Sequence, residues 1–585
     1  MAHTPTTDVL IAGAGPVGLS TAAELRRHGV SCRLVDRLPA RLPYAKAVGI
    51  QPRTLEIWDR MGLARTVVES AVPLRGQLIY ANGVERARVE LMLPPEVPYR
   101  FAALPQYETE RILEEHLAAL GTVIERGTEL LSFTQEADGP GGGVTSLLRT
   151  ASGGEEELRT RYLIGCDGAH STVRKGLGLS YEGGAFAEEY MLADVVSDWD
   201  LPEGYGLRSM HVGADGSTDD LLVCIPLPGR GRYRMSMLVP PELSAQPDGG
   251  PAGGSAGGPA GEPGAGDGVL HGLEGARVPE LSHIQAVVDR LAPAPSTVSA
   301  MRWSSVFRIS HRIVDRYGDG RVFVAGDAAH IHPPTGAQGM NTGIQDACNL
   351  AWKLALVLRE IAGPTLLATY DAERRPVGEE VVGRTVRHAT QGMENEPDDL
   401  RTVLLREAQL LVGYRDGPLA GSPFGPADAP QPGERAPDCS GLTLPLAAYP
   451  SRLLDVLRGR AGHVVLLYGD DGAALAGAAE QARAAGAALA EGDTDGSGAP
   501  GPPILAVLAR EAALDASAGL PDAVPGYRDA AGEFARLYGA DGPTGFLVRP
   551  DGHLGARFPL SGTAAALSGY LASLSARQAP GKTQH

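Results

Sequence analysis

The sequence predicts an α/β protein with a Rossmann-like unit, a second unit built mainly of β-strands and a smaller α/β unit at the carboxyl end. Three observations predict this class. A glycine-rich turn joins an apolar strand to a helix near the amino terminus, and two later apolar strands also end in turns that carry an aspartate. Beyond residue 417, strand-like and helix-like runs alternate again, and 585 residues suit several domains.

The first signal is a strand, a glycine turn and a helix in direct succession. Residues 9–12 are apolar and lead into Gly-Ala-Gly-Pro-Val-Gly at 13–18, after which a helical pattern begins. In this context Gly13 makes the tight turn, Gly15 lets backbone N–H groups approach a pyrophosphate, and Gly18 lets the helix lie close to the strand. The helix N-terminus then faces the phosphates. The pattern therefore predicts a bound dinucleotide.

A second strand, residues 32–35, ends in Asp36, where a carboxylate can accept hydrogen bonds from the hydroxyl pair of a ribose. The next segment, from Arg37 to Gly49, is rich in turn residues and is expected to be a loop. Its Lys46 is either a solvated surface residue or a cation that crosses the pyrophosphate, and the sequence leaves both interpretations open.

Two further apolar strands end in similar turns. Residues 162–165 lead into an Asp-Gly turn at 167–168, although such a turn also favours an ordinary strand-to-helix connection. Residues 320–325 lead into a Gly-Asp turn at 326–327, which a loop rich in Pro and Gly follows. A helix is expected to start near Thr342, and its N-terminus can stabilise negative charge on a bound ring.

Histidines and cysteines give no metal or redox signature. His330 and His332 stand two residues apart, but no Cys, Asp or Glu lies beside them at ligand spacing, so no metal is expected. The five cysteines are too far apart for a CxxC motif, a zinc ribbon or a redox pair. We expect them to be reduced.

Composition limits the classes of partner that the protein can bind. The net charge of −18 argues against a nucleic acid or an anionic membrane surface, because both need clustered Lys and Arg. No apolar run approaches the ~20 residues that span a bilayer, and the amino terminus lacks a secretion signal. We therefore expect a cytoplasmic protein whose partner is a small molecule.

The expected domain organisation follows from these signals. Residues 1–184 form the first part of the Rossmann-like domain, and residues 185–302 form a β-sheet domain. Residues 303–416 return to the first domain and continue into long helices, and residues 417–585 form the third domain. Within the second domain, residues 246–268 are almost only Gly, Pro, Ala, Ser and acidic residues. Such a tract buries too little apolar surface to fold, so we expect a flexible insertion without a catalytic role.

Taken together, the turns at Gly13, Asp167 and Gly326 closely resemble those of the single-component FAD-dependent aromatic hydroxylases with the para-hydroxybenzoate hydroxylase fold. The resemblance covers about residues 1–400, and the added third domain makes the chain most similar to the phenol hydroxylase and aromatic polyketide hydroxylase branch. In that branch the C-terminal domain is thioredoxin-like, and without CxxC it should be redox-inactive. The resemblance implies FAD as cofactor, NADPH or NADH as cosubstrate and a substrate-binding role for the β-sheet domain.

The resemblance also implies roles for individual residues. Asp36 would bind the FAD ribose, Gln106 the FAD linker and Asp327 the ribityl-phosphate region. Pro333 and Pro334 would form walls of the flavin site. The full set of expected cofactor-binding residues is Gly13, Gly15, Pro16, Gly18, Asp36, Arg37, Lys46, Gln106, Asp167, Gly168, Gly326, Asp327, Pro334, Gly336, Gly339, Met340 and Asn341.

The implied reaction begins when NADPH reduces FAD, after which O2 forms a flavin C4a-hydroperoxide that delivers one oxygen atom to an electron-rich ring. The site must be dry, because water would release H2O2 instead. Two residues depart from the family pattern: Asp36 replaces the commoner Glu, and Val48 stands where phenol hydroxylases often carry an Asp. The catalytic base is therefore unassigned. Trp303 and Phe307 are expected in the core rather than in the pocket.

Several other functions compete with aromatic hydroxylation. A flavin halogenase would carry a Trp-x-Trp arrangement and a disulfide reductase would carry close cysteines, and the chain has neither. Baeyer–Villiger-type oxygenation and a flavin-containing protein that only binds or sequesters its ligand stay open. The expected partners are a phenolic or polycyclic, polyketide-like aromatic substrate, O2 and NAD(P)H, and the expected state is a monomer or homodimer.

Overall fold

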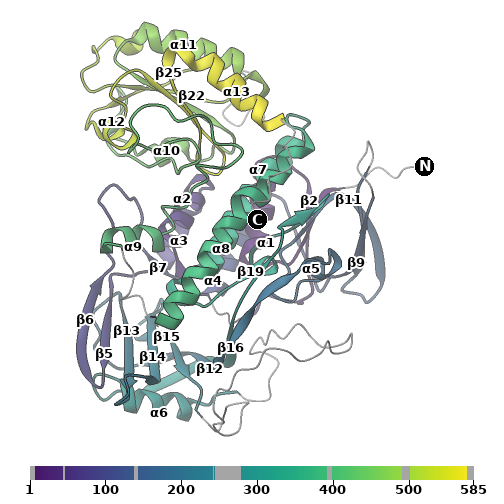
Figure 1. The fold of residues 1–585 in the computed structure, drawn as a ribbon, viewed down its shortest axis with the longest axis vertical. Helices are drawn as coiled ribbons and strands as arrows, with labels where there is room; N and C mark the ends of the chain where they lie inside the picture. The colour runs from purple at the N-terminus through teal and green to yellow at the C-terminus, as the bar shows by residue number, and fades with distance from the viewer. Residues whose placement is uncertain are drawn as a thin grey trace.

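The computed structural model describes residues 7–43, 47–136, 142–240, 243, 278–391, 398–489 and 501–575. In this part of the chain the strands form three large sheets and one small sheet. The third sheet and its helices lie at one end of the long axis and the second sheet lies at the other end, with helices α7 (Gly339–Leu358) and α8 (Ala368–Gln391) between them (Figure 1). Lys46 and the expected flexible insertion 246–268 lie outside the described residues.

The first sheet is the Rossmann-like sheet that the amino-terminal pattern predicts. Its strands in spatial order are β17 (Gly318–Asp319), β18 (Val322–Val324), β11 (Glu155–Gly165), β1 (Thr7–Ala12), β2 (Cys32–Asp36) and β8 (Ile124–Arg126), and β10 (Val144–Arg149) and β9 (Glu129–Gln135) extend it beside β11. From β18 to β8 all neighbours are parallel. Val9, Leu10 and Ile11 of β1 are fully buried, as a parallel strand covered on both faces requires.

Helices α1 (Pro16–Arg27) and α5 (Thr172–Gly176) contact the strands of this sheet. The other helices of this part of the chain are α2 (Pro52–Arg60), α3 (Ala64–Ser70), α4 (Gln106–Ala119), α7 and α8. Helix α7 is buried over almost its whole length and packs against α1. It begins at Gly339, three residues before the start expected near Thr342, because the Gln338 carbonyl already accepts a helical hydrogen bond from the Thr342 N–H (2.9 Å).

The second sheet has eight strands and is mostly antiparallel. Their order is β19 (His330–Ile331), β16 (Val298–Val314), β12 (Tyr181–Ser197), β15 (Arg232–Leu238), β14 (Thr218–Pro226), β13 (Tyr205–Val212), β5 (Gly76–Ala81) and β6 (Val84–Glu90). Strands β12 and β16 run without a break across the expected boundaries at 184/185 and 302/303. The pair β5 and β6 also belongs to this sheet, although its residues fall in the range expected for the first domain. Helix α6 (Leu281–Leu291) packs on the sheet.

The fourth sheet is small. Its strands are β3 (Gly49–Ile50), β7 (Ala102–Ala103) and β4 (Val72–Pro73), with β7 in the middle. Trp303 and Phe307 lie on β16, where Phe307 is buried and the Trp303 indole N–H donates to Asp194 (2.9 Å). Helix α9 (Leu400–Glu407) follows α8 in the chain.

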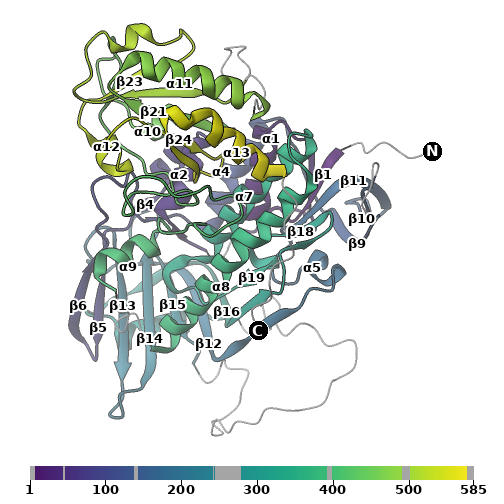
Figure 2. The ribbon, with the colours of Figure 1, turned by 45° about the horizontal axis from the view of Figure 1, so that its top comes forward.

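The third unit is a mixed sheet with the order β20 (Leu442–Thr443), β23 (Gly526–Asp529), β22 (Ile504–Leu508), β21 (Val464–Gly469), β24 (Thr544–Val548) and β25 (Leu554–Pro559). Strands β21 to β23 are parallel and β24 and β25 form an antiparallel hairpin. Its helices are α10 (Leu453–Leu457), α11 (Gly472–Ala485), α12 (Glu533–Tyr538) and α13 (Thr563–Ser575), and α11 and α13 lie side by side (Figure 2). The three sheets confirm the predicted fold class. No helix among the described residues is long and apolar enough to cross a membrane.

Candidate active site

Three turns singled out in the sequence meet at one edge of the first sheet. They follow the carboxyl ends of β1, β11 and β18, and these ends lie at the same edge because the strands are parallel. A β-carbon placed on Gly13 would lie 2.3 Å from the Cys166 carbonyl oxygen, so the first turn packs directly on the second. A β-carbon on Gly326 would lie 2.8 Å from Cγ2 of Val17, so the third turn packs on the first turn of α1. This edge is where α/β sheets bind ligands.

The three glycines of the first turn have the different structural roles that the motif predicts. Gly13 has φ +98°, which a residue with a side chain rarely adopts. A β-carbon on Gly18 would lie 1.8 Å from the Gly13 carbonyl oxygen, so this position sets the close approach of helix and strand. No atom lies within 4 Å of the corresponding position on Gly15, which is the N-cap of α1 and receives no side-chain cap. The N-terminus of α1 thus has the open space that a pyrophosphate requires, so these residues can accommodate the pyrophosphate of FAD.

The acidic residues of the turns are held by backbone N–H groups. Asp36 accepts from the N–H groups of Ala14 (2.7 Å) and Leu38 (2.8 Å). Asp167 accepts from the Ser171 hydroxyl (2.5 Å) and the Thr172 N–H (2.7 Å), and so caps the start of α5. Burial raises the pKa of Asp167 above its ordinary value. In this structure both carboxylates stabilise their own turns.

A buried aspartate in α7 holds the third turn. Asp346 accepts hydrogen bonds from the Gly326 N–H (3.2 Å), Nε2 of His330 (2.8 Å) and Nε of Arg374 (2.8 Å). Burial alone would raise the pKa of Asp346, but the charges of Arg374 and His330 outweigh it and hold that pKa below its ordinary value. The sequence analysis missed this residue, although an acid inside an otherwise apolar helix was a usable signal.

Arg174 joins the second turn to the third. Its guanidinium is buried and donates to the carbonyl oxygens of Ala169 (2.7 Å) and Ala328 (3.3 Å). The same group lies 3.9 Å from the centre of the Tyr181 ring, and the Tyr181 hydroxyl donates to the Asp327 carbonyl (2.9 Å). The second sheet is therefore tied directly to the cofactor-type turns.

The proline loop is fixed by polar contacts to α7 and β3. Pro333 is buried, whereas Pro334 is exposed. Nδ1 of His332 donates to the Pro333 carbonyl (2.9 Å), and burial lowers the pKa of His332 to about 4, so this ring is neutral at neutral pH. Nε2 of Gln51 donates to the Gly336 carbonyl (2.6 Å), and Nδ2 of Asn341 donates to the Gly49 carbonyl (3.0 Å). Nδ2 of Asn341 also donates to the Ala337 carbonyl (2.8 Å), so this expected residue joins the proline loop to β3.

The other expected residues lie around this edge. Pro16 is buried in the first turn of α1 and Arg37 is exposed after β2. Met340 packs against the main core, and a β-carbon on Gly339 would lie 3.4 Å from Nε2 of His332. Gly168, like Gly15, has open space around it.

The two remaining positions are Gln106, the first residue of α4, and Val48, which directly precedes β3. The Gln106 N–H donates to the Ala47 carbonyl (3.0 Å), and Nε2 of Gln106 donates to Glu110 (2.8 Å). Val48, the departure from the family pattern, is buried in an apolar cluster with Ala103 and Leu227. No proton-accepting group stands at that position, as the sequence indicated.

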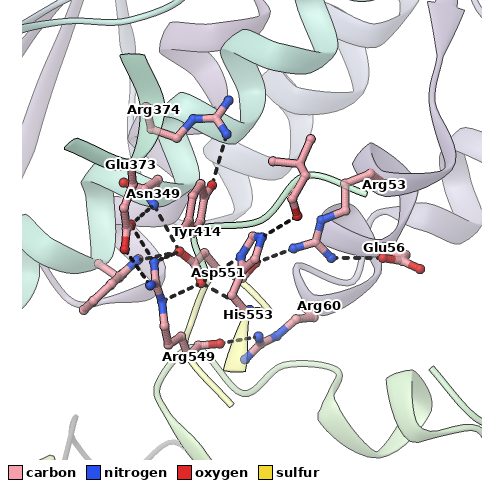
Figure 3. A network of polar contacts seen from close by, with 12 residues as sticks. Arg53, Glu56, Arg60, Asn349, Glu373, Arg374, Tyr414, Arg549, Asp551 and His553 are labelled. Atoms are coloured by element: carbon pink, nitrogen blue, oxygen red, sulfur yellow. Dashed lines mark hydrogen bonds and ion pairs between the residues drawn. The ribbon is translucent and has the colours of Figure 1, made fainter. Parts of the chain in front are cut away.

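A buried ionic network joins the third unit to α7 and α8 (Figure 3). Arg549, next to the β24–β25 turn, donates to both carboxylate oxygens of Glu373 (2.7 and 2.8 Å) and to Asp551 (2.5 Å). Nζ of Lys353 also donates to Glu373 (2.7 Å), and the Trp352 indole donates to Asp551 (3.2 Å). Burial would raise the pKa of Glu373, but Arg549 and Lys353 lower it to about 2. The junction is therefore ionised and paired.

The network continues to the third turn through α8. Arg374 follows Glu373 in the helix and donates to the Tyr414 hydroxyl (3.0 Å) as well as to Asp346. Asp346 in turn accepts the Gly326 N–H. Two sets of buried polar contacts, joined by the adjacent residues Glu373 and Arg374 of α8, thus link the hairpin of the third unit to the cofactor-type turn. The sequence analysis missed it, because its members come from distant segments with no shared spacing.

Comparison with known proteins gives this edge its chemistry. The model of the family described as "FAD binding domain" matches residues 6–251 and 276–385. A flavin-dependent monooxygenase of Mycobacteroides abscessus is 33% identical over 473 residues, which cover 78% of this chain and 88% of that protein. A 6-methylpretetramide 4-monooxygenase of Streptomyces rimosus is 38% identical over 380 residues, which cover 64% of this chain and 60% of that protein.

A solved structure extends the likeness to the whole chain. The ternary complex of aklavinone-11 hydroxylase with FAD and aklavinone has a TM-score of 0.71 and 26% identity, and the match covers 98% of this chain and 99% of that one. The predictions of FAD as cofactor and of an FAD-dependent aromatic monooxygenase are confirmed. The chain belongs to the FAD-binding-domain family of flavin-dependent aromatic monooxygenases.

Proposed function

We propose that this monooxygenase adds one oxygen atom from O2 to a phenolic or polycyclic aromatic substrate and uses NADPH or NADH as reductant. The observation that carries the proposal is the meeting of three cofactor-type turns beside a loop with a buried proline. Two relatives support the substrate class, because they are named for 6-methylpretetramide and aklavinone. A polyketide-like substrate is therefore the first to test.

The residues of the chain would bind FAD and shield it. Gly15 and the N-terminus of α1 would bind the pyrophosphate, and Asp36 would turn to the ribose. Bound FAD would supply the electron transfer and oxygen activation that side chains do not provide. Pro333 would exclude water from the flavin site, and the N-terminus of α7 would stabilise negative charge on the flavin ring.

We further propose that the second sheet holds the substrate. Strand β16 of that sheet pairs with β19, which directly precedes the proline loop. Strand β12 of the same sheet carries Tyr181, whose hydroxyl meets the Asp327 carbonyl. A ring bound on this sheet would therefore face the same turns as the flavin.

The test is product analysis under isotopically labelled O2 with NADPH and a panel of polycyclic phenols and quinones. We expect a product with one additional oxygen atom, labelled and located in a ring hydroxyl. Label in a new ester or lactone would show that the enzyme catalyses Baeyer–Villiger insertion and not hydroxylation. Label found only in water and peroxide across the panel would refute the proposal.

A further inference from the structure

A cavity of about 230 Å³ lies between the first turn of α4, the end of α3 and the second sheet. Its charged lining consists of Arg111, Arg232, Arg302 and Glu108, and Tyr107 forms part of its wall. Three arginines against one glutamate make this cavity positive in a chain whose net charge is −18. The cavity therefore differs in charge from the molecule around it.

Two of these arginines have no acidic partner among the described residues. Nη1 of Arg302 donates to the Tyr107 hydroxyl (2.9 Å), and Nη2 of Arg232 donates to the same oxygen (3.4 Å). Nη1 of Arg232 donates to the Pro228 carbonyl (3.3 Å). Arg111 differs, because it pairs with Glu108 (2.8 Å) on its own helix. Two guanidinium groups thus converge on one neutral oxygen and keep their charge available to an anion.

Tyr107 supplies a donor that the described protein does not use. A phenol oxygen has two acceptor sites and one O–H donor, and the two arginines occupy the acceptor sites. No acceptor for the O–H group occurs among the described residues, although the side chain is only 4% exposed. A buried donor without an acceptor costs free energy, so an acceptor oxygen in the cavity would relieve that cost.

The position of the cavity relates it to the flavin edge. Tyr107 directly follows Gln106, which is bonded to the Ala47 backbone. Helix α4 spans 14 residues, and its N-cap receives no side-chain hydrogen bond, so its positive end adds to the arginines. Strand β7, just before α4, pairs with β3, and a β-carbon on Gly49 of β3 would lie 2.4 Å from Cβ of Ala337 in the proline loop.

We propose that this cavity binds a phosphate group of the pyridine dinucleotide that reduces the flavin. The inference rests on the proposed function, because it assigns a site to the cosubstrate named there. Guanidinium groups match phosphate oxygens with paired N–H donors, and the Tyr107 O–H adds a third donor. The volume is below the roughly 300 Å³ at which pockets for whole ligands begin, so the cavity suits one end of a dinucleotide. The remainder of the dinucleotide would extend toward the flavin edge.

The test uses the full-length, FAD-loaded protein with Arg302→Gln, Arg232→Gln and Tyr107→Phe. Rapid mixing under anaerobic conditions gives the concentration of NADPH or NADH that half-saturates flavin reduction. We expect this concentration for NADPH to rise at least about tenfold in each arginine variant and less in Tyr107→Phe. A rise for NADPH alone would place the 2′-phosphate in the cavity, and equal rises for both nucleotides would place the pyrophosphate there.

Arg65→Gln is the matched control, because Arg65 is an exposed arginine on α3, the helix whose last residue lines the cavity. It should leave the half-saturating concentration unchanged. Arg302→Lys keeps the charge but loses the planar fork, so an intermediate value is expected. Unchanged half-saturation in the arginine variants, or loss of bound FAD from them, would overturn the inference. Failure of the proposed function would appear differently, as wild-type protein that NADPH does not reduce.

Discussion

The cofactor-type turns and the junction with the third unit are both held in place by close packing, but they achieve it with different kinds of residue. At the turns the structure relies on missing side chains, since β-carbons on Gly13 and Gly18 would collide with backbone oxygens. At the junction it relies on large charged side chains, of which Arg549 and Glu373 are fully buried. Gly13 and Gly18 therefore tolerate no added side chain, and the junction does not tolerate the loss of a charge.

The difference predicts which property each region controls. Open space at Gly15 can admit a ligand, so changes there should act on FAD binding with little effect on folding. The junction admits no ligand but holds several charges away from water, and an unpaired buried charge is costly. Changes at the junction should act first on stability.

The largest expected effect is on stability at the junction. Glu373→Gln would leave Lys353 without its paired carboxylate and Arg549 with Asp551 as its remaining carboxylate partner, in a buried site. We expect the free energy of unfolding to fall by about 3–5 kcal/mol, measured by chemical denaturation of the FAD-loaded protein. The control is Glu129→Gln, which removes half of the exposed pair with Arg149 and should cost less than about 1 kcal/mol. Equal costs for both variants would contradict the comparison.

The next effect concerns the cofactor. Gly15→Val would fill the open space at the N-terminus of α1, so FAD affinity should fall by at least about 100-fold while the fold is retained. Fluorescence titration of apoprotein with FAD measures the affinity, and circular dichroism checks the fold. Gly477→Val on α11 is the matched control, since that position is also open but lies far along the chain in the third unit. Unaltered FAD affinity in Gly15→Val would refute the cofactor site.

A third effect sharpens the comparison, because Glu110 of α4, on the cofactor side, is also a buried acid. Burial raises the pKa of Glu110 to about 7, so the folded protein binds a proton that the unfolded chain releases near pH 4.5. Stability from this group is present below pH 4.5 and is lost as the pH rises to 7, by up to about 3 kcal/mol.

Glu110→Gln should therefore flatten the fall in melting temperature between pH 5 and pH 8. Thermal unfolding at several pH values measures this change. Glu115→Gln, an exposed change on the same helix, should keep the wild-type profile. A Glu110→Gln profile as steep as that of the wild type would show that another group titrates.

The smallest effect tests the link between the two regions. Asp346→Asn would weaken the contacts to Gly326 and Arg374, so FAD affinity should fall on the order of tenfold and more H2O2 should form per NADPH oxidised. Asp289→Asn, on α6 and paired only with Gln285 among the described residues, is the control. Wild-type affinity and coupling in Asp346→Asn would show that the network ends at Arg374.

The sequence by itself determined the parts of the protein that depend on local backbone conformation. A strand, three glycines at fixed spacing and a helix predict the turn between them, because each glycine is required by steric contacts within a few residues. The same holds for the Asp-Gly and Gly-Asp turns and for the hairpin at Gly552, which has φ +78°. Fold class and FAD followed from these local signals.

Only the tertiary structure decided what depends on long-range pairing. Asp346, Glu373 and Arg549 lie near one another because α7, α8 and the hairpin pack together. Neither the spacing of these residues in the sequence nor their types predict this arrangement. The cavity at Tyr107 likewise needs α4 to meet Arg232 and Arg302 on the second sheet. A side chain's charge is written in the sequence, but whether it is paired, buried or left free for a ligand depends on which distant segments the fold brings beside it.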